Sequence, residues 1–401
     1  MCETPMRRLA ATLAVILAIL VYGLSLIEMD VVATGDALAA NLLLDFNEQR
    51  PESFSGVTGP REWSFPADYG PHPDFATEWW YYTGNLQSED GRRFGYQFTI
   101  FRRALRPDIE TNGSEWRGDQ VYMAHFTVTD VDGKRFLHDQ RYSRAGAGLA
   151  GATGEPSLHI WLEDLEMQAL NDEASRIRLR AAMEGASIDF TLEQEKPPRL
   201  RGIEGYSRKG AEPHQASYYY SIPRLATRGT LTLVGEEIAV QGESWMDHEF
   251  FTQYLAGDVA GWDWFALIFD DGREMSLGWL RLTDGGERYY GGGGSAAFLV
   301  EADGSTRQIA PADFHVETTA SWTSPHSGAS YPAGWQVRMD GDSPLEFTLR
   351  PLLADQELHE SAIVYWEGAI AIEGDVAGFG YAELTGYHVP MGTDFFGSSG
   401  A

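Results

Sequence analysis

An acidic residue stands beside aromatic residues in two segments of the chain, a combination suited to proton transfer to an apolar molecule. In the segment from Glu243 to Phe250, the period-two alternation of a strand would put Trp245 and Asp247 on one face and His248 on the other. If that face lines an apolar pocket, burial raises the pKa of Asp247, which can then stay protonated and donate its proton.

The chemistry that follows from this pair is hydration. Protonation of a carbon–carbon double bond produces a carbocation, which aromatic faces stabilise through their quadrupoles. Capture of the cation by water completes the reaction. The pattern therefore indicates Asp247 as a general acid with Trp245 beside it. The competing interpretation is an acidic turn that faces solvent, which is natural in a chain this acidic.

The second segment is Glu78 followed by four aromatic residues, on which a strand would place Glu78 and Trp80 on one face. This face could line a ligand pocket, or it could pack internally with Glu78 neutralised by an arginine. A third aromatic strand carries Tyr218 and Tyr220 on a shared face, as pocket wall or as ordinary β packing. Trp262 opens a further aromatic strand.

Several other kinds of site lack support in the sequence. The segment from Gly242 to Met246 lacks the last glycine of a nucleophile elbow. The glycines of 291–294 precede no Gly-Lys-Ser/Thr, so a flexible hairpin loop is expected there and no phosphate loop. The ten histidines show no metal-binding spacing, and alternation separates His248 from Asp247 and Glu249. We expect no metal and no cofactor.

The elements that must position these residues are short β strands. Alternating runs are separated by Asp-Gly pairs, which are strong hairpin signals. The runs with the clearest alternation are 97–101, 125–129 and 188–192. The Asp-Gly pairs are at 90–91, 132–133, 271–272 and 303–304. Only a weak short helix is expected, near Pro311 to Phe314.

Two of the expected hairpins resemble each other. One runs from Glu78 through Asp90-Gly91 to Phe98, and the other from Trp262 through Asp271-Gly272 to Leu280. This similarity indicates either two β-barrels in tandem, each opening with an aromatic strand, or only the general likeness of antiparallel hairpins. With 44 glycines, 18 tyrosines, 12 tryptophans and one cysteine, the chain is predicted to be all-β and free of disulfides.

Length and charge exclude some partners. The 401 residues suggest two globular units at roughly 150 residues per domain. The formal net charge of −29 disfavours nucleic acid and anionic lipid headgroups as partners. The boundaries expected from the sequence are 1–30 for a signal peptide or membrane anchor, 31–61 for a linker, 62–252 and 253–392 for two domains, and 393–401 for a tail.

The N-terminus predicts export or anchoring. Arg7 and Arg8 precede an uncharged stretch from Leu9 to Ile27, which is long enough to span a bilayer as a helix. The charges on either side orient the body of the protein outward. The alternative is a cleaved signal, with Ala37-Leu38-Ala39 as a cleavage site. In a bacterium the globular part would face the periplasm, either anchored to the inner membrane or secreted.

Four motifs together resemble the AttH-like family, which includes the carotenoid 1,2-hydratases (hydroxyneurosporene synthases). They are 78–81, 218–224, 242–249 and 261–265, and the resemblance runs from about Trp63 to Pro390. It implies two tandem lipocalin-like antiparallel β-barrels, with a site for an isoprenoid- or lipid-like ligand near their interface.

The hydratase branch of this family implies roles for individual residues. An Asp protonates the terminal double bond of an acyclic carotene, assisted by a Tyr two residues before it, and a His-x-Trp pair lines the site. Asp247 matches the Asp, whereas Trp245 stands at the Tyr position and Tyr218 and Tyr220 fall near the His and Trp. These departures put carotene itself in doubt as the substrate.

The sequence thus predicts an exported, hydratase-like protein that binds a hydrophobic unsaturated molecule. Of the enzyme classes, it favours the hydro-lyases. Asp247 and Trp245 are the expected catalytic residues. The expected ligand-binding residues are Glu78, Trp80, Tyr218, Tyr220 and Trp262. The alternative is a non-catalytic lipocalin-like carrier, in which Asp247 has an orienting role.

Overall fold

The computed structural model describes the chain from Phe54 to Met391 with short gaps. The described residues are 54–105, 118–253, 255, 257–289, 295–341, 343–361 and 363–391. The expected N-terminal anchor, the loop at 291–294 and the tail lie outside them. Among the described residues, no helix is long and apolar enough to cross a membrane.

The first sheet uses thirteen strands, all from the N-terminal part of the described chain. Its hydrogen-bonded order is β4-β3-β2-β1-β13-β12-β9-β8-β7-β6-β5, and β10 and β11 pair with β12. The strands are β1 Thr77–Ser88, β2 Arg93–Ala104, β3 Gln120–Asp130, β4 Arg135–Arg144, β5 Ala150–Thr153, β6 His159–Leu162, β7 Leu165–Ala169, β8 Arg176–Met183, β9 Ala186–Gln194, β10 Arg199–Leu200, β11 Tyr206–Arg208, β12 Ala216–Leu233 and β13 Glu236–Phe251.

The second sheet has eleven strands in the order β18-β17-β15-β14-β24-β23-β21-β20-β19, and β16 and β22 pair with β15 and β23. Its strands are β14 Val259–Phe269, β15 Glu274–Leu282, β16 Glu287–Tyr289, β17 Ala297–Val300, β18 Thr306–Ile309, β19 Phe314–Thr323, β20 Ser330–Met339, β21 Leu345–Pro351, β22 Glu357–Leu358, β23 Tyr365–Gly374 and β24 Gly378–Leu384. The weak helix expected near Pro311 is a single 3₁₀ turn, η4 Pro311–Asp313.

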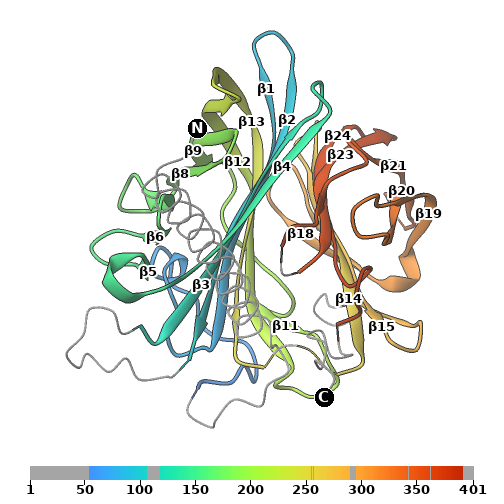
Figure 1. Cartoon of the computed structure of the whole chain (residues 1–401). Coiled ribbons are helices and arrows are strands. Elements are labelled where there is room, and N and C mark those ends of the chain that lie inside the picture. The colour runs from blue at the N-terminus through green and yellow to red at the C-terminus, as the bar shows by residue number, and fades with distance from the viewer. Residues whose placement is uncertain are drawn as a thin grey trace, which may run out of the picture.

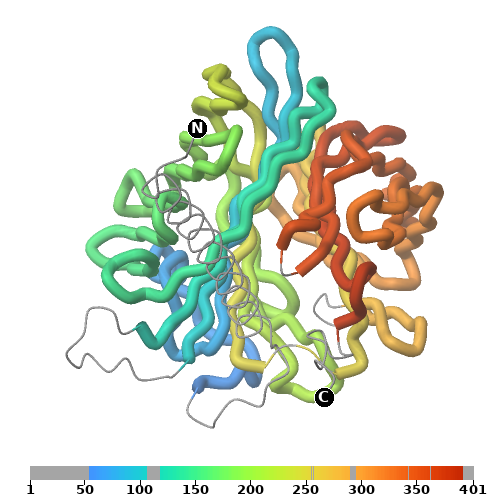
Figure 2. The backbone as a smooth tube through the Cα atoms, in the orientation of Figure 1, coloured from blue at the N-terminus to red at the C-terminus, as the bar shows by residue number. Residues whose placement is uncertain are grey.

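The predicted all-β architecture of two tandem barrels is confirmed. The first sheet curls into a nearly closed barrel and the second into a half-barrel. Figure 1 shows them side by side, with the long strands β12 and β13 at their junction. The colour of the tube in Figure 2 changes from blue and green in the first body to orange and red in the second.

The four Asp-Gly pairs turn the chain between paired strands, as predicted. They connect β1 to β2, β3 to β4, β14 to β15 and β17 to β18. Gly91 and Gly272 have φ values of +89° and +88°, a left-handed conformation that glycine adopts at no steric cost. The Asp-Gly sequence therefore sets the hairpins that carry the two aromatic strands.

Strand alternation divides the hydrophobic residues among three cores. Trp80 and Tyr82 of β1 point into the first barrel, and residues such as Phe265 fill the second. Tyr81 belongs to a third core between the two sheets, where its ring meets that of Trp264 edge-on at 5.2 Å. The two similar aromatic hairpins therefore face each other across the junction.

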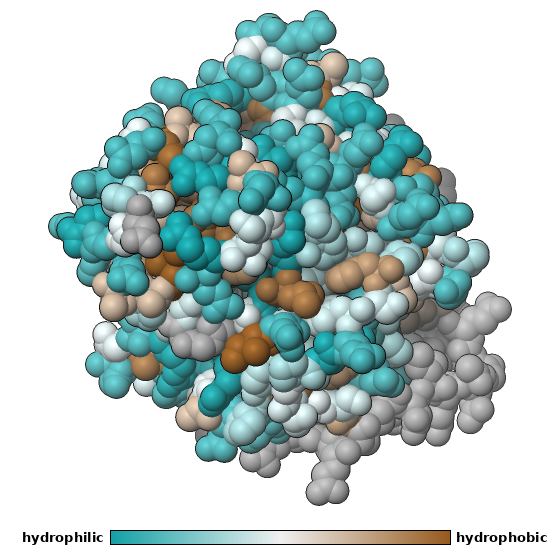
Figure 3. All heavy atoms as spheres, turned by 180° about the vertical axis from the view of Figure 1, so that it is seen from behind, coloured by the Kyte–Doolittle hydropathy of each residue, from teal (hydrophilic) through white to brown (hydrophobic). Residues whose placement is uncertain are grey.

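Hydrophilic residues cover most of the face seen in Figure 3, where hydrophobic residues form only small separate patches. This distribution agrees with the charged composition, because most of the surplus acids lie on the solvated surface.

Candidate functional site

A cavity of about 100 Å³ lies between the two sheets, within the third core. Its walls come from β1, β2, β3, β12 and β13 on one side and from β14, β15, β23 and β24 on the other. The aromatic residues that line it are Trp79, Tyr81, Phe101, Tyr219, Trp262, Trp264 and Tyr365. The acidic residues that line it are Asp247, Glu249, Glu367 and Glu383. The cavity thus combines rings with carboxyl groups.

Asp247 of β13 is 3% exposed and is held by three donors. The Tyr219 hydroxyl donates to Oδ2 at 2.6 Å, and the Ser221 hydroxyl and the Trp245 indole N–H donate to Oδ1 at 2.5 and 2.8 Å. Trp245 and Asp247 share a face, as alternation predicts. Burial raises the pKa of Asp247 above its ordinary value, although Arg201 and these donors oppose the shift.

Two further carboxyl groups, on the opposite wall, had no signal in the sequence. Glu367 of β23 and Glu383 of β24 stand directly opposite each other in the strand register. The Tyr81 hydroxyl donates to Glu367, and the Trp262 indole N–H donates to Glu383 Oε1 at 2.8 Å. Burial, followed by the neighbouring carboxyl, raises the pKa of Glu367 well above its ordinary value. Burial raises the pKa of Glu383 to about 7.

The remaining ionisable residues of the cavity, Glu249 and His125, each have a partner within the described structure. Glu249 Oε1 lies 3.0 Å from Lys209 Nζ, which is itself buried. Burial lowers the pKa of His125 to about 3, so this imidazole is neutral. Its Nδ1 lies 2.7 Å from the Tyr365 hydroxyl. The cavity therefore offers carboxyl groups of raised pKa and no charged imidazole among its described lining residues.

Only one of the five expected ligand-binding residues, Trp262, lines this cavity. Trp80 and Tyr220 belong to the core of the first barrel, on the other face of the sheet from Asp247. Tyr218 packs at the barrel end against Trp63 and Phe250. Alternation correctly grouped Tyr218 with Tyr220, but the residue between them, Tyr219, is the one that reaches Asp247.

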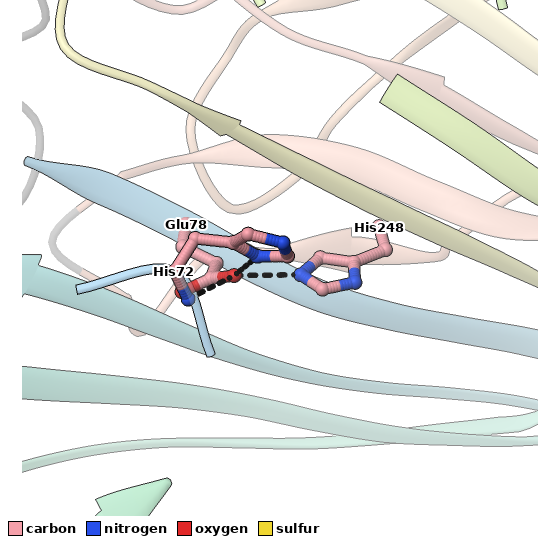
Figure 4. A group of neighbouring side chains, drawn as sticks. All are labelled: His72, Glu78 and His248. Carbon is pink, nitrogen blue, oxygen red and sulfur yellow. Dashed lines mark hydrogen bonds and ion pairs between the residues drawn. The ribbon is translucent and has the colours of Figure 1, made fainter. Parts of the chain in front are cut away.

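Glu78 also lies on the barrel side, in a cluster with His72 and His248 (Figure 4). Its Oε1 is 2.7 Å from His72 Nδ1 and 2.8 Å from His248 Nε2, and Arg102 Nε donates to its Oε2 at 2.9 Å. The alternative interpretation of Glu78, neutralisation by an arginine, is what the structure shows. The Tyr220 hydroxyl extends the cluster to His248 Nδ1 at 2.8 Å.

The ligand atoms of His72, Glu78 and His248 lie within 4.8 Å of one another, a spacing compatible with a metal ion. The donor set fits a metal poorly, because the guanidinium of Arg102 already supplies the positive charge next to Glu78. Together with the histidines, Arg102 also holds the pKa of Glu78 well below its ordinary value despite complete burial. The cluster is therefore a self-contained ion-pair network. Spacing could not reveal it, because Arg102 and His248 are remote in sequence from Glu78.

Comparisons with known proteins match nearly all of the described chain to one protein family. A protein-family model described as AttH-like matches residues 56–387. The crystal structure of a Nitrosomonas europaea protein assigned as AttH is 35% identical, with 83% of this chain and 100% of that chain covered and a TM-score of 0.73. Kievitone hydratase from Nectria haematococca is 15% identical, with 85% and 98% covered and a TM-score of 0.61, which shows a shared fold. No curated protein matches the chain.

Proposed function

Because the chain belongs to the AttH-like family, we propose that it binds an apolar, unsaturated small molecule between its two sheets and adds water to a carbon–carbon double bond there. The ligand class is isoprenoid- or lipid-like. The reaction class is that of a hydro-lyase, which needs a proton donor, a surface that stabilises a cation, and water.

The observation that carries this proposal is the burial of Asp247 beside aromatic rings in the cavity between the two sheets. Burial raises the pKa of Asp247, so this carboxyl group keeps its proton to a higher pH than an exposed aspartate does. Asp247 gives this proton to one carbon of the double bond, and the other carbon becomes cationic. The rings of Trp262 and Trp264 stabilise the cation, and water closes the reaction by forming the new C–O bond.

The cavity size limits what can enter. At about 100 Å³ it is smaller than a cavity of about 150 Å³ that holds benzene. A long isoprenoid would therefore place only its reacting end between the sheets. Trp245 fixes Asp247 through its indole N–H and so acts as a positioning residue.

The name of one structural neighbour agrees with this reaction class. Kievitone hydratase shares the fold with this chain, and its name states a hydration. We also propose that residues 1–30 export the protein or anchor it to the inner membrane, so that the cavity faces the periplasm. There it could reach membrane-embedded isoprenoids.

The test incubates the full-length protein with squalene, an acyclic carotene and an unsaturated fatty acid, followed by mass analysis of the products. Wild type is compared with Asp247→Asn and with the matched surface variant Asp172→Asn. We expect a product that gains one water in wild type and Asp172→Asn, and none in Asp247→Asn. Product formation at the wild-type rate by Asp247→Asn would refute its role as the acid.

A specific observation favours the second candidate, a non-catalytic carrier. Three donors converge on Asp247, as they would on a carboxylate with an orienting role. Ligand retained unchanged by wild type and Asp247→Asn alike would sink the enzymatic proposal and support the carrier.

A further inference from the structure

The wall opposite Asp247 carries a second arrangement of acids, with its own geometry. Glu367 and Glu383 are cross-strand partners on β23 and β24, and both line the cavity. Side chains directly opposite in an antiparallel pair have Cβ atoms about 5 Å apart. Two carboxylates on such partners, facing one cavity, repel each other, which disfavours the state in which both are ionised.

We propose that Glu367 and Glu383 act as one unit that holds a single proton at neutral pH, binds the attacking water and takes the proton which that water loses. This inference rests on the proposed hydration, and it names the residues that carry out the second step, the addition of water. Asp247 supplies a proton from one wall, and the pair receives a proton at the other.

The hydrogen-bond partners of Glu367 leave one of its oxygens available. Its Oε1 accepts from the Tyr81 hydroxyl, and the Tyr365 hydroxyl also faces its carboxyl group. Its Oε2 is buried and has no hydrogen-bond partner among the described residues. A buried oxygen without a partner is costly unless a ligand or water satisfies it. The free oxygen on a cavity-lining carboxyl group therefore marks a place for water.

A chain of hydrogen bonds fixes the direction of the donors around the pair. The Gln140 amide bonds to His125 Nε2, so the hydrogen of the neutral imidazole lies on Nδ1. Nδ1 then donates to the Tyr365 oxygen, which leaves the hydroxyl hydrogen of Tyr365 free to point toward Glu367. The imidazole adds orientation without adding a positive charge, because its pKa is about 3.

No cation pairs directly with either carboxyl group in the described contacts. The titratable groups that face the pair are Tyr81, His125, Asp247, Glu249, Tyr365 and Tyr381. Asp247 and Glu249 raise the pKa of Glu383, and the nearby Lys209 is committed to Glu249. The surroundings thus favour one negative charge on the pair over two, and that charge also attracts the carbocation.

The atoms balance over the reaction. The π electrons of the double bond form a C–H bond with the Asp247 proton, and Asp247 becomes ionised. Water forms a C–O bond with the cation, one of its O–H bonds breaks, and that proton passes to the ionised member of the pair. The pair then holds two protons, and return of one to Asp247 restores the starting state.

The first test needs no substrate. Infrared spectroscopy of the full-length protein follows the C=O band of protonated carboxyl groups across pH. We expect wild type to lose a protonated carboxyl in a step near the pKa of about 7 for Glu383. Glu383→Gln should remove that step and lower the pKa of Glu367, because Glu367 then no longer faces a like charge, and Glu367→Gln should remove the protonated carboxyl that persists above the step. Asp247→Asn should retain a step from the pair, and the exposed same-strand control Glu373→Gln should match wild type. Absence of a protonated carboxyl at neutral pH, or an unchanged step in both pair variants, would overturn the shared proton.

The second test separates this inference from the proposed function. With squalene as the probe, each pair variant should lose about 100-fold or more in kcat while it still binds the probe. If wild type hydrates none of the probes, the proposed function fails, and the infrared step still decides whether the proton is shared. If wild type hydrates a probe and both pair variants keep its kcat and pH profile, the water-activating role is wrong and the proposed function stands.

Discussion

Replacement of Glu78 by glutamine tests whether the buried ion-pair network supports the first barrel. Glu78 is 0% exposed and Arg102 is 1% exposed, with 2.9 Å between Nε and Oε2. Removal of one partner of a buried pair costs about 3–5 kcal/mol, because the other charge remains buried without compensation. Arg102 Nη2 still donates to the carbonyls of His72 and Phe75, so we expect the lower end, about 3 kcal/mol.

The assay is denaturant-induced unfolding of the full-length protein, followed by circular dichroism and tryptophan fluorescence. The matched control is Glu236→Gln, which removes a surface pair with Arg92 at 3.0 Å and should cost less than about 1 kcal/mol. A loss for Glu78→Gln no larger than that of the control would refute the reasoning.

The difference in stability between wild type and Glu78→Gln should depend on pH, and the direction of that dependence follows from the pKa of Glu78. The network holds the pKa of Glu78 below its unfolded value, so its stabilisation is present above that unfolded value. It is lost as pH falls through the folded pKa. The difference in unfolding free energy between wild type and Glu78→Gln should therefore shrink as pH falls through the acid range.

Three further substitutions test the cavity and the strand junction. Tyr219→Phe removes a donor to Asp247, which raises the pKa of that acid further, so the limb of the pH–rate profile that Asp247 sets should move to higher pH. Trp262→Phe removes the indole donor to Glu383 and should raise its pKa above about 7, which moves the limb that Glu383 sets to higher pH. A pH–rate profile that does not shift in a variant would contradict the assignment of that residue. Gly84→Ala would place a Cβ 2.5 Å from side-chain atoms of both neighbouring strands and should cost about 1–3 kcal/mol in chemical denaturation, whereas an unchanged midpoint would show that the strands can separate there.

Local sequence signals were sufficient for much of the fold. The alternation in 97–101 and 125–129 reflects strands whose two faces meet different surroundings, and both lie in the predicted state. Asp-Gly pairs carry their own conformational preference, so they located four hairpins. The first sheet nearly closes into a barrel, whereas the second forms only a half-barrel. This difference depends on strand pairing between distant segments, which no local pattern encodes.

The candidate site could likewise be predicted only in part. Period two predicted that Trp245 and Asp247 share a face, because that relation is internal to one strand. Which face of β12 meets Asp247 depends on the register that pairs Ser221 with Asp247, and so Tyr219 was missed. Glu367 and Glu383 become neighbours only through the pairing of β23 with β24.

The two walls of the cavity belong to sheets whose interiors are packed by different sets of hydrophobic residues. Asp247 is fixed on a sheet whose interior is packed by one set of hydrophobic residues, and the opposite acids stand on a sheet packed by another. Substitutions that reshape the second wall therefore leave the packing beneath Asp247 intact. Such a division lets the shape and charge of the second wall change without repacking the interior of the first barrel.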